Sequence, residues 1–351
     1  ENLRRAIECY QNALRVYTET DFPEDWAMTQ HNLGNAYADL PTGDRGENLR
    51  RAIECYQNAL RVYTETDFPE DWAMTQHNLG LAYAQLPTGD RSENLRRAIE
   101  CYQNALRVHT ETDFPVEWAR TQHNLGLAYA QLPTGDRGEN LRKAIECYQN
   151  ALRIYTETDF PVEWAVTRNN LGLAYAMLTT GDRSENLHKA IEYYQQAQKV
   201  FTENAFPAEW AATQNNLGVA YAMLAIGNQH SGTDFPVKCV ATLYNLGLAY
   251  FDLPTGNRRQ NRDEATNNCQ GAIQHYENAL RVYTETDFPM EWAITQNNLG
   301  WTMRLLAAEL SDFQLLDSAK ACFEAAARGF EAVGLHEQAQ EARRQARELG
   351  D

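Results

Sequence analysis

The sequence predicts an all-α protein of the α-solenoid class, in which pairs of antiparallel helices stack on one another along one direction. Three observations predict this fold. A unit of 46 residues recurs, and the copy at residues 47–92 differs from residues 1–46 at only three positions. Each copy holds two amphipathic runs of helical period, separated by turn residues. A fixed period of roughly 20 to 50 residues is typical of arrays whose units bury their apolar faces against their neighbours.

The first expected helix of the unit begins after the Asp-Phe-Pro turn at residues 67–69. Proline suits the first turn of a helix, and Pro87 with Gly89 ends the run. One face of this helix carries the packing residues Trp72, Gln76, Leu79, Tyr83 and Leu86. The tryptophan recurs every 46 residues, at Trp26, Trp72, Trp118, Trp164 and Trp210.

The second expected helix begins near Asp90, which together with Glu93 has the pattern of a capping box. In the preceding copy, the packing face of this helix consists of Leu49, Ala52, Ile53, Tyr56, Ala59, Leu60 and Tyr63. The unit therefore consists of a first helix, a loop, a second helix and another loop.

The spacing of small and large residues resembles the signature of the tetratricopeptide repeat (TPR) family. Leu79, Gly80 and Tyr83 match its L-G-x-x-Y pattern in the first helix. The second helix carries the pattern A-x-x-x-F/Y-x-x-A at Ala98, Tyr102 and Ala105. The resemblance covers nearly the whole chain and implies a right-handed superhelix of helix pairs. The loops of the 46-residue unit are longer than those of the usual TPR unit of about 34 residues. In this respect the unit resembles the long-period repeats of bacterial, particularly cyanobacterial, proteins and of kinesin light chains.

Four segments are expected along the chain. Regular TPR-like repeats occupy residues 1–224 and begin in the middle of a repeat, as in a fragment. An irregular joint at 225–271 lacks one second helix and carries a short insertion, because Gly218 is followed by Gly247 after 29 residues instead of 46. A terminal TPR-like repeat follows at 272–334, and residues 335–351 form a capping helix with a polar outer face.

Two arrangements of the joint are compatible with the pattern. In the first, which we favour, a first-type helix at 237–253 takes the place of the missing second helix and buries its apolar face there. In the second, the polar segment 227–233 crosses back and leaves a gap in the stack.

Composition narrows the class of partner. The formal charge of −17 disfavours nucleic acid and favours a basic or uncharged partner. No apolar run is long enough to span a bilayer and no signal peptide opens the chain, so a cytoplasmic protein that binds no membrane is expected. Cysteines recur once per repeat, too far apart for a disulfide, and no C-x-x-C pair supports a zinc site, so they are expected to be small buried residues. No metal or cofactor is expected.

A second stripe beside the packing face is the candidate binding surface, because the resemblance implies that it lines a concave groove. In one copy it consists of Met74, Asn78, Leu81 and Gln85, which share a face of the first helix. It becomes more apolar along the chain and ends in the copy with Trp301. The predicted groove residues are Asn78, Asn124, Asn170, Asn216, His77, His123, Asn169, Asn215, Leu127, Leu173, Met177, Val219, Met223 and Trp301.

The asparagine of this stripe recurs in every copy, at Asn32, Asn78, Asn124, Asn170, Asn216, Asn245 and Asn298. An amide donates and accepts, so it can hold a peptide backbone without reading its side chains. Alternatively, each asparagine bonds a neighbouring helix and sets the repeat geometry. Recurrence does not decide between these two roles, because the copies descend from duplication.

The position before the asparagine holds His31, His77 and His123, then asparagine or tyrosine in later copies. Histidines one repeat apart cannot share a zinc ion, so polar groove contacts or pH-sensitive rim groups are expected. The basic pair with which TPR relatives clamp a carboxylate is absent, and only Arg120, Arg168 and Arg304 are basic on these faces.

The sequence contains none of the short catalytic motifs, and the Thr-Gly-Asp-Arg turns are explained as helix punctuation. We therefore expect a non-catalytic scaffold that binds an extended peptide or a partner helix, of unknown identity. One alternative is the sensor or regulatory arm of a larger effector such as a CHAT-type protease, a domain that the bacterial relatives often carry and this sequence does not show. Another is a self-assembling array that associates end to end.

Overall fold

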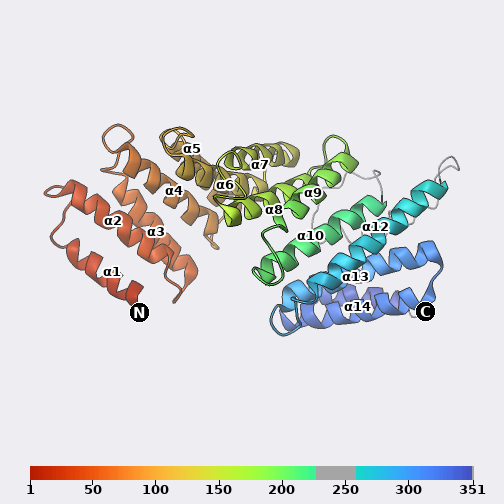
Figure 1. Ribbon diagram of the computed structural model, residues 1–351. Coiled ribbons are helices and arrows are strands. Elements are labelled where there is room, and N and C mark those ends of the chain that lie inside the picture. The colour runs from red at the N-terminus through yellow and green to blue at the C-terminus, as the bar shows by residue number, and fades with distance from the viewer. Residues whose placement is uncertain (227–257, 350–351) are drawn as a thin grey trace. The chain divides into compact units, whose positions relative to one another are not determined.

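The computed structural model describes residues 1–226 and 258–349, and this part of the chain forms fourteen helices and no strand (Figure 1). The side chains of residues 225, 226 and 258–264 are not described. The prediction of an all-α protein made of repeated helix pairs is confirmed.

The chain divides into two compact units, which we describe separately. Unit 1 (Glu1–Thr156) contains α1 (Asn2–Ala13), α2 (Pro23–Ala38), α3 (Arg45–Ala59), α4 (Pro69–Gln85), α5 (Arg91–Ala105), α6 (Pro115–Gln131) and α7 (Arg137–Ala151). Unit 2 (Glu157–Asp351) contains α8 (Pro161–Met177), α9 (Arg183–Ala197), α10 (Pro207–Ile226), α12 (Arg258–Ala279), α13 (Pro289–Leu310), α14 (Phe313–Ala332) and α15 (His336–Glu348).

Neighbours in the chain are neighbours in space within each unit. In unit 1, each first helix packs on the second helix that follows it, and that second helix packs on the next first helix. Successive first helices also touch, since α2 contacts α4 and α4 contacts α6. The first helices of unit 1 therefore lie in one layer.

Turn chemistry fixes where the helices begin. Proline occupies the first turn of α4, and Asp90 accepts hydrogen bonds from the backbone N–H groups of Ser92 (2.8 Å) and Glu93 (3.3 Å) at the start of α5. Only half of the predicted capping box forms, because the Glu93 carboxylate pairs with Arg97 at 3.0 Å. Gly89 has a φ of 84°, a left-handed conformation that explains the glycine in this turn.

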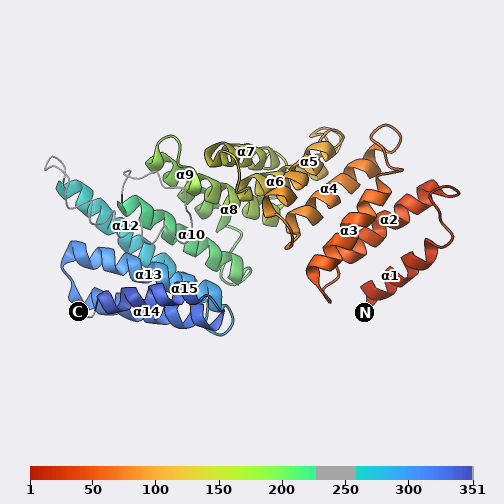
Figure 2. The same ribbon diagram turned by 180° about the vertical axis from the view of Figure 1, so that it is seen from behind.

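The helix that follows α10 among the described residues is α12. The place of the second helix beside α10 is taken by α12, which also packs on α13 (Figure 2). A Cβ at Gly218 of α10 would lie 2.6 Å from Tyr276 of α12, the same close approach that pairs the helices of the regular repeats. The two arrangements predicted for the joint both depend on residues that the structure does not describe, so they stay predictions. Residues 237–253 and 227–233 lie outside the described part of the chain.

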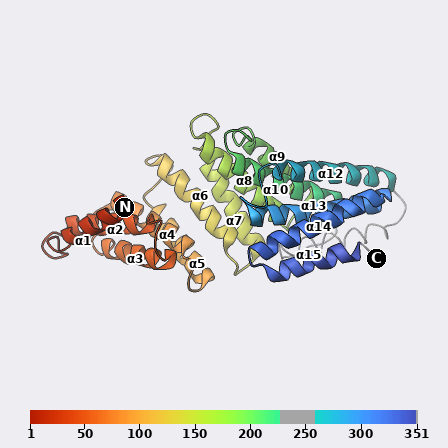
Figure 3. The same cartoon turned by 90° about the horizontal axis from the view of Figure 1, so that it is seen from below.

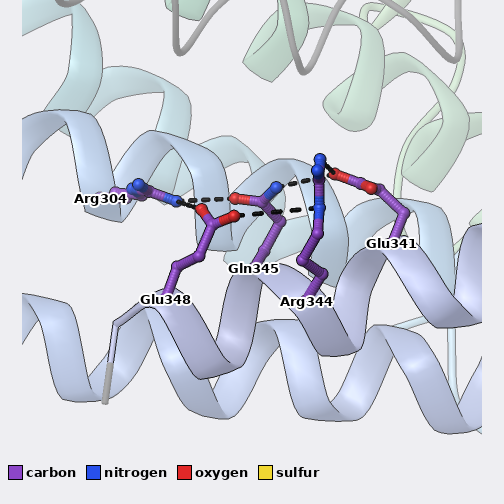
Figure 4. A network of polar contacts seen from close by, with 5 residues as sticks. All are labelled: Arg304, Glu341, Arg344, Gln345 and Glu348. Carbon is purple, nitrogen blue, oxygen red and sulfur yellow. Dashed lines mark hydrogen bonds and ion pairs between the residues drawn. The ribbon is translucent and has the colours of Figure 1, made fainter. Parts of the chain in front are cut away.

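The last three helices of unit 2, α13, α14 and α15, pack on one another in chain order. Helix α14 lies between α13 and α15, as the view from below shows (Figure 3). Ala339, Ala342 and Ala346 of α15 are buried, while its other face is largely charged. Polar contacts between α13 and α15 flank this apolar face, with Arg304 donating to Gln345 Oε1 at 2.7 Å and pairing with Glu348 at 3.4 Å (Figure 4).

Candidate functional site

The solvent-facing stripe of α4 and α6 carries exposed apolar and polar side chains in unit 1. Leu81 and Leu127 are each 37% exposed and occupy equivalent positions of successive first helices. We define the first-helix surface by the exposed residues Met74, Leu81, Gln85, Arg120, Leu127 and Gln131. Asn78 and Asn124 lie within the same stripe and are half-buried.

A hollow of about 550 Å³ opens on the first-helix surface. It brings together Leu127 and Asn124, both predicted from the sequence, with Leu81 and Gln85 of the preceding repeat. Its remaining lining residues are Arg45, Ala84, Leu86, Pro87, Gly89, Arg91, Tyr102, Ala128 and Gln131. The hollow therefore presents apolar, amide and guanidinium groups side by side.

Two arginines of this hollow were missed by sequence reasoning. Arg45 and Arg91 each follow the aspartate that caps a second helix, in the Thr-Gly-Asp-Arg turn that the sequence pattern explains as helix punctuation alone. Arg91 Nη2 donates to Gln131 Oε1 at 2.6 Å, and Arg45 Nη2 donates to Gln85 Oε1 at 2.7 Å. The available signal was the recurrence of one arginine per repeat beside the C-terminal end of a first helix.

The second nitrogen of each guanidinium binds a first helix. Arg45 Nη1 donates to the carbonyl of Ala38, and Arg91 Nη1 donates to the carbonyl of Ala84. The last carbonyls of a helix lack partners within it, so a cation there satisfies an acceptor and complements the helix dipole. Each arginine thus ties the end of one first helix to the next.

The predicted histidines lie inside the helix layer. His77 is 2% exposed, and burial lowers its pKa to about 3. Its Nδ1 lies 2.8 Å from Thr121 Oγ1, and its Nε2 lies 3.4 Å from Asn124 Nδ2. The Thr121 hydroxyl donates to the Glu117 carbonyl at 2.7 Å, so Nδ1 must be the protonated nitrogen of a neutral His77.

A hydrogen bond between a histidine and the threonine of the next repeat also occurs at the neighbouring repeat of unit 1. His31 Nδ1 lies 2.7 Å from Thr75 Oγ1. Burial lowers the pKa of His123 to about 4, although its side chain is not fully covered. Sequence reasoning missed the threonines, whose signal was a recurrence two residues before each histidine or asparagine, at Thr29, Thr75, Thr121, Thr167, Thr213 and Thr295.

In unit 2 asparagine replaces histidine in this hydrogen bond. Asn169 Oδ1 accepts hydrogen bonds from Thr213 Oγ1 at 3.4 Å and from Asn216 Nδ2 at 3.3 Å. Asn215 Oδ1 accepts one from Thr295 Oγ1 at 3.3 Å. These amides therefore hold successive first helices together, while Asn216 and Asn170 remain half-buried at the surface.

The apolar residues predicted for unit 2 fall into two groups. Leu173, Met177 and Val219 are half-buried on α8 and α10. Met223 (9% exposed) and Trp301 (5% exposed) lie in the interior, so neither offers a free surface. The Trp301 ring packs edge-on against Phe323 at 5.4 Å between centroids, and Ala346 of α15 belongs to the same cluster.

Within the described residues, no group of three His, Cys, Asp or Glu side chains is placed to hold a metal ion. Cys55, Cys101 and Cys147 are buried, and burial raises the pKa of each thiol to about 12. None of the described helices combines the length and the apolar character that crossing a membrane requires.

Comparisons with known proteins add the following similarities. The family described as soluble NSF attachment protein (SNAP) matches residues 1–114. Among solved structures, the chain is similar to BtubC (BKLC) from P. vanneervenii, with 20% identity and a TM-score of 0.46 over 74% of this chain and 93% of that one.

Two further structures match over nearly the whole chain. A Rap protein complexed with Competence and Sporulation Factor has 12% identity and a TM-score of 0.39, covering 99% of this chain and 97% of its own. The TPR domain of P58(IPK) has 12% identity and a TM-score of 0.27, covering 99% and 98%. No curated protein matches the sequence.

Proposed function

We propose that this chain is a non-catalytic protein-interaction scaffold whose first-helix surface binds an extended peptide. The observation that carries the proposal is the hollow between successive first helices of unit 1, where exposed leucines stand beside amide side chains. Such a lining suits a polypeptide, because a peptide presents apolar side chains and backbone polar groups along the same edge.

The apolar part of the surface supplies binding free energy. Leu81 and Leu127 come from equivalent positions of successive repeats, so one extended segment can cover both. Covering apolar area contributes about 25 cal/mol per Å², less the cost of ordering the peptide. The leucines therefore favour a peptide with apolar side chains at intervals.

The side-chain amides of the first-helix surface can orient the backbone of a bound peptide. Gln85 and Gln131 are exposed, and each carries donor and acceptor groups that can serve a peptide backbone. Asn78 Nδ2 donates to Asn35 Oδ1 at 3.1 Å, so the asparagines already hold neighbouring helices. We assign them a supporting role, with their accessible edges available to the ligand, and we leave the buried His77 out of the contact surface.

Unit 2 has a comparable stripe. Leu173, Met177 and Val219 stand beside Asn170 and Asn216 on α8 and α10. These side chains are less exposed than their counterparts in unit 1, so we propose unit 1 as the principal binding region. Met223 and Trp301, which are interior, are left out.

The proposal is tested by selecting binders from a displayed library of random peptides and measuring their affinity by fluorescence anisotropy. Leu81→Asp and Leu127→Asp should each weaken the selected peptides at least tenfold, roughly the effect of removing an interface anchor. Val116→Asp is the matched control, because Val116 is an apolar residue of α6 that is 40% exposed and does not line the hollow. Equal loss in the control, or no loss in either leucine variant, would refute the assigned surface.

We also propose a cytoplasmic location. Its support is that the described cysteines are free thiols and that three of the repeated ones are buried, as suits a reducing compartment.

A further inference from the structure

We propose that the peptide bound by unit 1 is acidic, with carboxylate side chains at every third residue that pair with Arg45 and Arg91. This inference deepens the proposed function and rests on it. It assigns the charge of the partner and the spacing of its charges, which the apolar and amide contacts leave open.

The charge of the hollow supports an acidic partner. Two guanidiniums and no carboxylate stand among the side chains that line it. Arg45 and Arg91 are both exposed, so a ligand can reach them without a rearrangement of the core. The lining therefore complements a negative ligand, although the chain as a whole is acidic.

The two arginines retain the means to bind a carboxylate. A guanidinium has five N–H donors, and each of these arginines uses two in the bonds to its helix-end carbonyl and its glutamine. The neighbouring glutamine accepts through Oε1, which leaves its amide nitrogen as a second donor beside the guanidinium. A carboxylate with two acceptor oxygens can bridge these donors in a charge-assisted contact.

The repeat sets the spacing of the carboxylates. Arg45 and Arg91 are 46 residues apart and occupy equivalent positions of successive repeats. Successive first helices touch one another, and packed helices lie about 8 to 10 Å apart. A polyproline II chain rises about 3.1 Å per residue with three residues per turn, so about three residues span one repeat and every third side chain points the same way.

The net charge of −17 does not oppose this pairing at short range. Charges separated by more than about 10 Å are largely screened at 0.1 M salt, whereas a carboxylate in contact with a guanidinium is screened much less. The expectation of a basic or uncharged partner follows from the whole surface, and the local lining of the hollow outweighs it at the site.

The test uses terminally blocked peptides of about nine residues, the span of three repeats for a polyproline II chain. One peptide carries glutamate at every third position among apolar residues, the second carries glutamine instead, and the third has the same composition with its glutamates adjacent. Binding is measured by isothermal titration calorimetry at about 0.1 M salt. We expect the spaced glutamate peptide to bind roughly tenfold more tightly than either of the others.

Arg45→Gln and Arg91→Gln should each reduce that preference roughly threefold, because the two arginines share a preference of about tenfold. Arg50→Gln and Arg96→Gln are matched controls on the same helices, since their guanidiniums donate to the hydroxyls of Thr88 (2.9 Å) and Thr134 (3.0 Å). Thermal melting followed by circular dichroism identifies any variant that fails to fold. In that case Arg45→Lys and Arg91→Lys replace it, and these should keep the charge preference in part.

Two results would overturn the inference. In the first, the glutamate and glutamine peptides bind with equal affinity and both lose binding in Leu127→Asp. This result would contradict an acidic partner but would still support the proposed peptide-binding surface. In the second, the peptides with spaced and with adjacent glutamates bind with equal affinity. This result would contradict the proposed match between the spacing of the carboxylates and the spacing of Arg45 and Arg91. Failure of every peptide to respond to Leu127→Asp would instead count against the proposed function itself.

Discussion

Gly80 of α4 packs directly against Tyr102 of α5, because a Cβ at Gly80 would lie only 2.9 Å from Tyr102 Cε1. The same Cβ would lie 3.2 Å from the carbonyl oxygen of Ala98. Tyr102 is itself 1% exposed, so the ring has no room to retreat. The glycine of the L-G-x-x-Y pattern is thus required by the packing of a tyrosine from the next helix.

Gly80→Ala should therefore destabilise unit 1 by about 1 to 3 kcal/mol through overpacking. Alanine favours a helix over glycine by about 1 kcal/mol, which offsets part of the loss. Urea unfolding followed by circular dichroism measures the net change. Gly46→Ser is the control, because serine occupies the equivalent positions Ser92 and Ser184, and an equal loss there would contradict the packing explanation.

Acid should destabilise unit 1 through His77. Its folded pKa is lowered to about 3 because the ring is buried, whereas an unfolded histidine titrates near pH 6.5. The unfolded chain then binds more protons between these values. The contribution of neutral His77 is therefore complete above about pH 6.5 and is lost as the pH falls toward 3, at up to about 1.4 kcal/mol per pH unit.

His77→Asn should flatten this pH dependence between about pH 6.5 and 4. Asparagine is the natural choice, because Asn169 occupies the equivalent position and accepts a hydrogen bond from Thr213 at 3.4 Å. The measurement is the urea midpoint at a series of pH values, with the exposed His188→Asn as the control. An unchanged slope in the His77 variant would show that other groups dominate the acid response.

The fold followed from the sequence because its determinants are local and repeated. Helical periodicity, Pro69 at a helix start and the Gly80–Tyr102 spacing each act within one unit, so 46 residues carry the information for the regular array. Apolar periodicity alone does not specify which helix packs beside α10. The choice depended on Tyr276 reaching Gly218 across a long separation in sequence.

The candidate site was predictable only in part. The face carrying Asn124 and Leu127 follows from helical spacing, and both residues line the hollow. Burial of His77 did not follow, because it depends on Thr121 in the next repeat offering a hydroxyl. Arg91 was missed because its reach across to Gln131 depends on the position of a helix from another repeat.

Arg304 should hold α15 in place. Its side chain is 11% exposed, donates to Gln345, pairs with Glu348 and lies 5.3 Å above the ring of Trp301. Arg304→Ala removes these contacts and leaves the buried Gln345 acceptor without this donor, at a cost of about 1 to 3 kcal/mol.

Hydrogen exchange measures this effect, because the amides of α15 should exchange faster in Arg304→Ala while those of α1 to α7 should not. Arg344→Ala is the control, since Arg344 is 64% exposed and its pairs with Glu341 and Glu348 are surface contacts worth at most about 1 kcal/mol. If the amides of α15 exchange at the same rate in both variants, the buried alanines of α15 alone hold this helix against its neighbours.

Thr121→Val should destabilise unit 1 although it keeps the size of the side chain. The substitution removes the oxygen that accepts from His77 Nδ1–H and leaves a buried donor unpaired, which costs about 1 to 3 kcal/mol. Thr121→Ser keeps the hydroxyl and should lose only about 1 kcal/mol through the missing methyl group. The comparison separates the hydrogen bond from the packing of the same side chain.

A second readout tests the direction of the bond. Nitrogen chemical shifts of the imidazole should show Nδ1 protonated in the unmodified chain, because Asn124 donates to Nε2 and the Thr121 hydroxyl is committed to the Glu117 carbonyl. In Thr121→Val the Nδ1–H has no acceptor at this place, so the tautomer balance should shift toward Nε2–H. A valine variant as stable as the unmodified chain, with an unchanged tautomer, would mean that the threonine does not hold the histidine and that the first helices stay together by apolar packing.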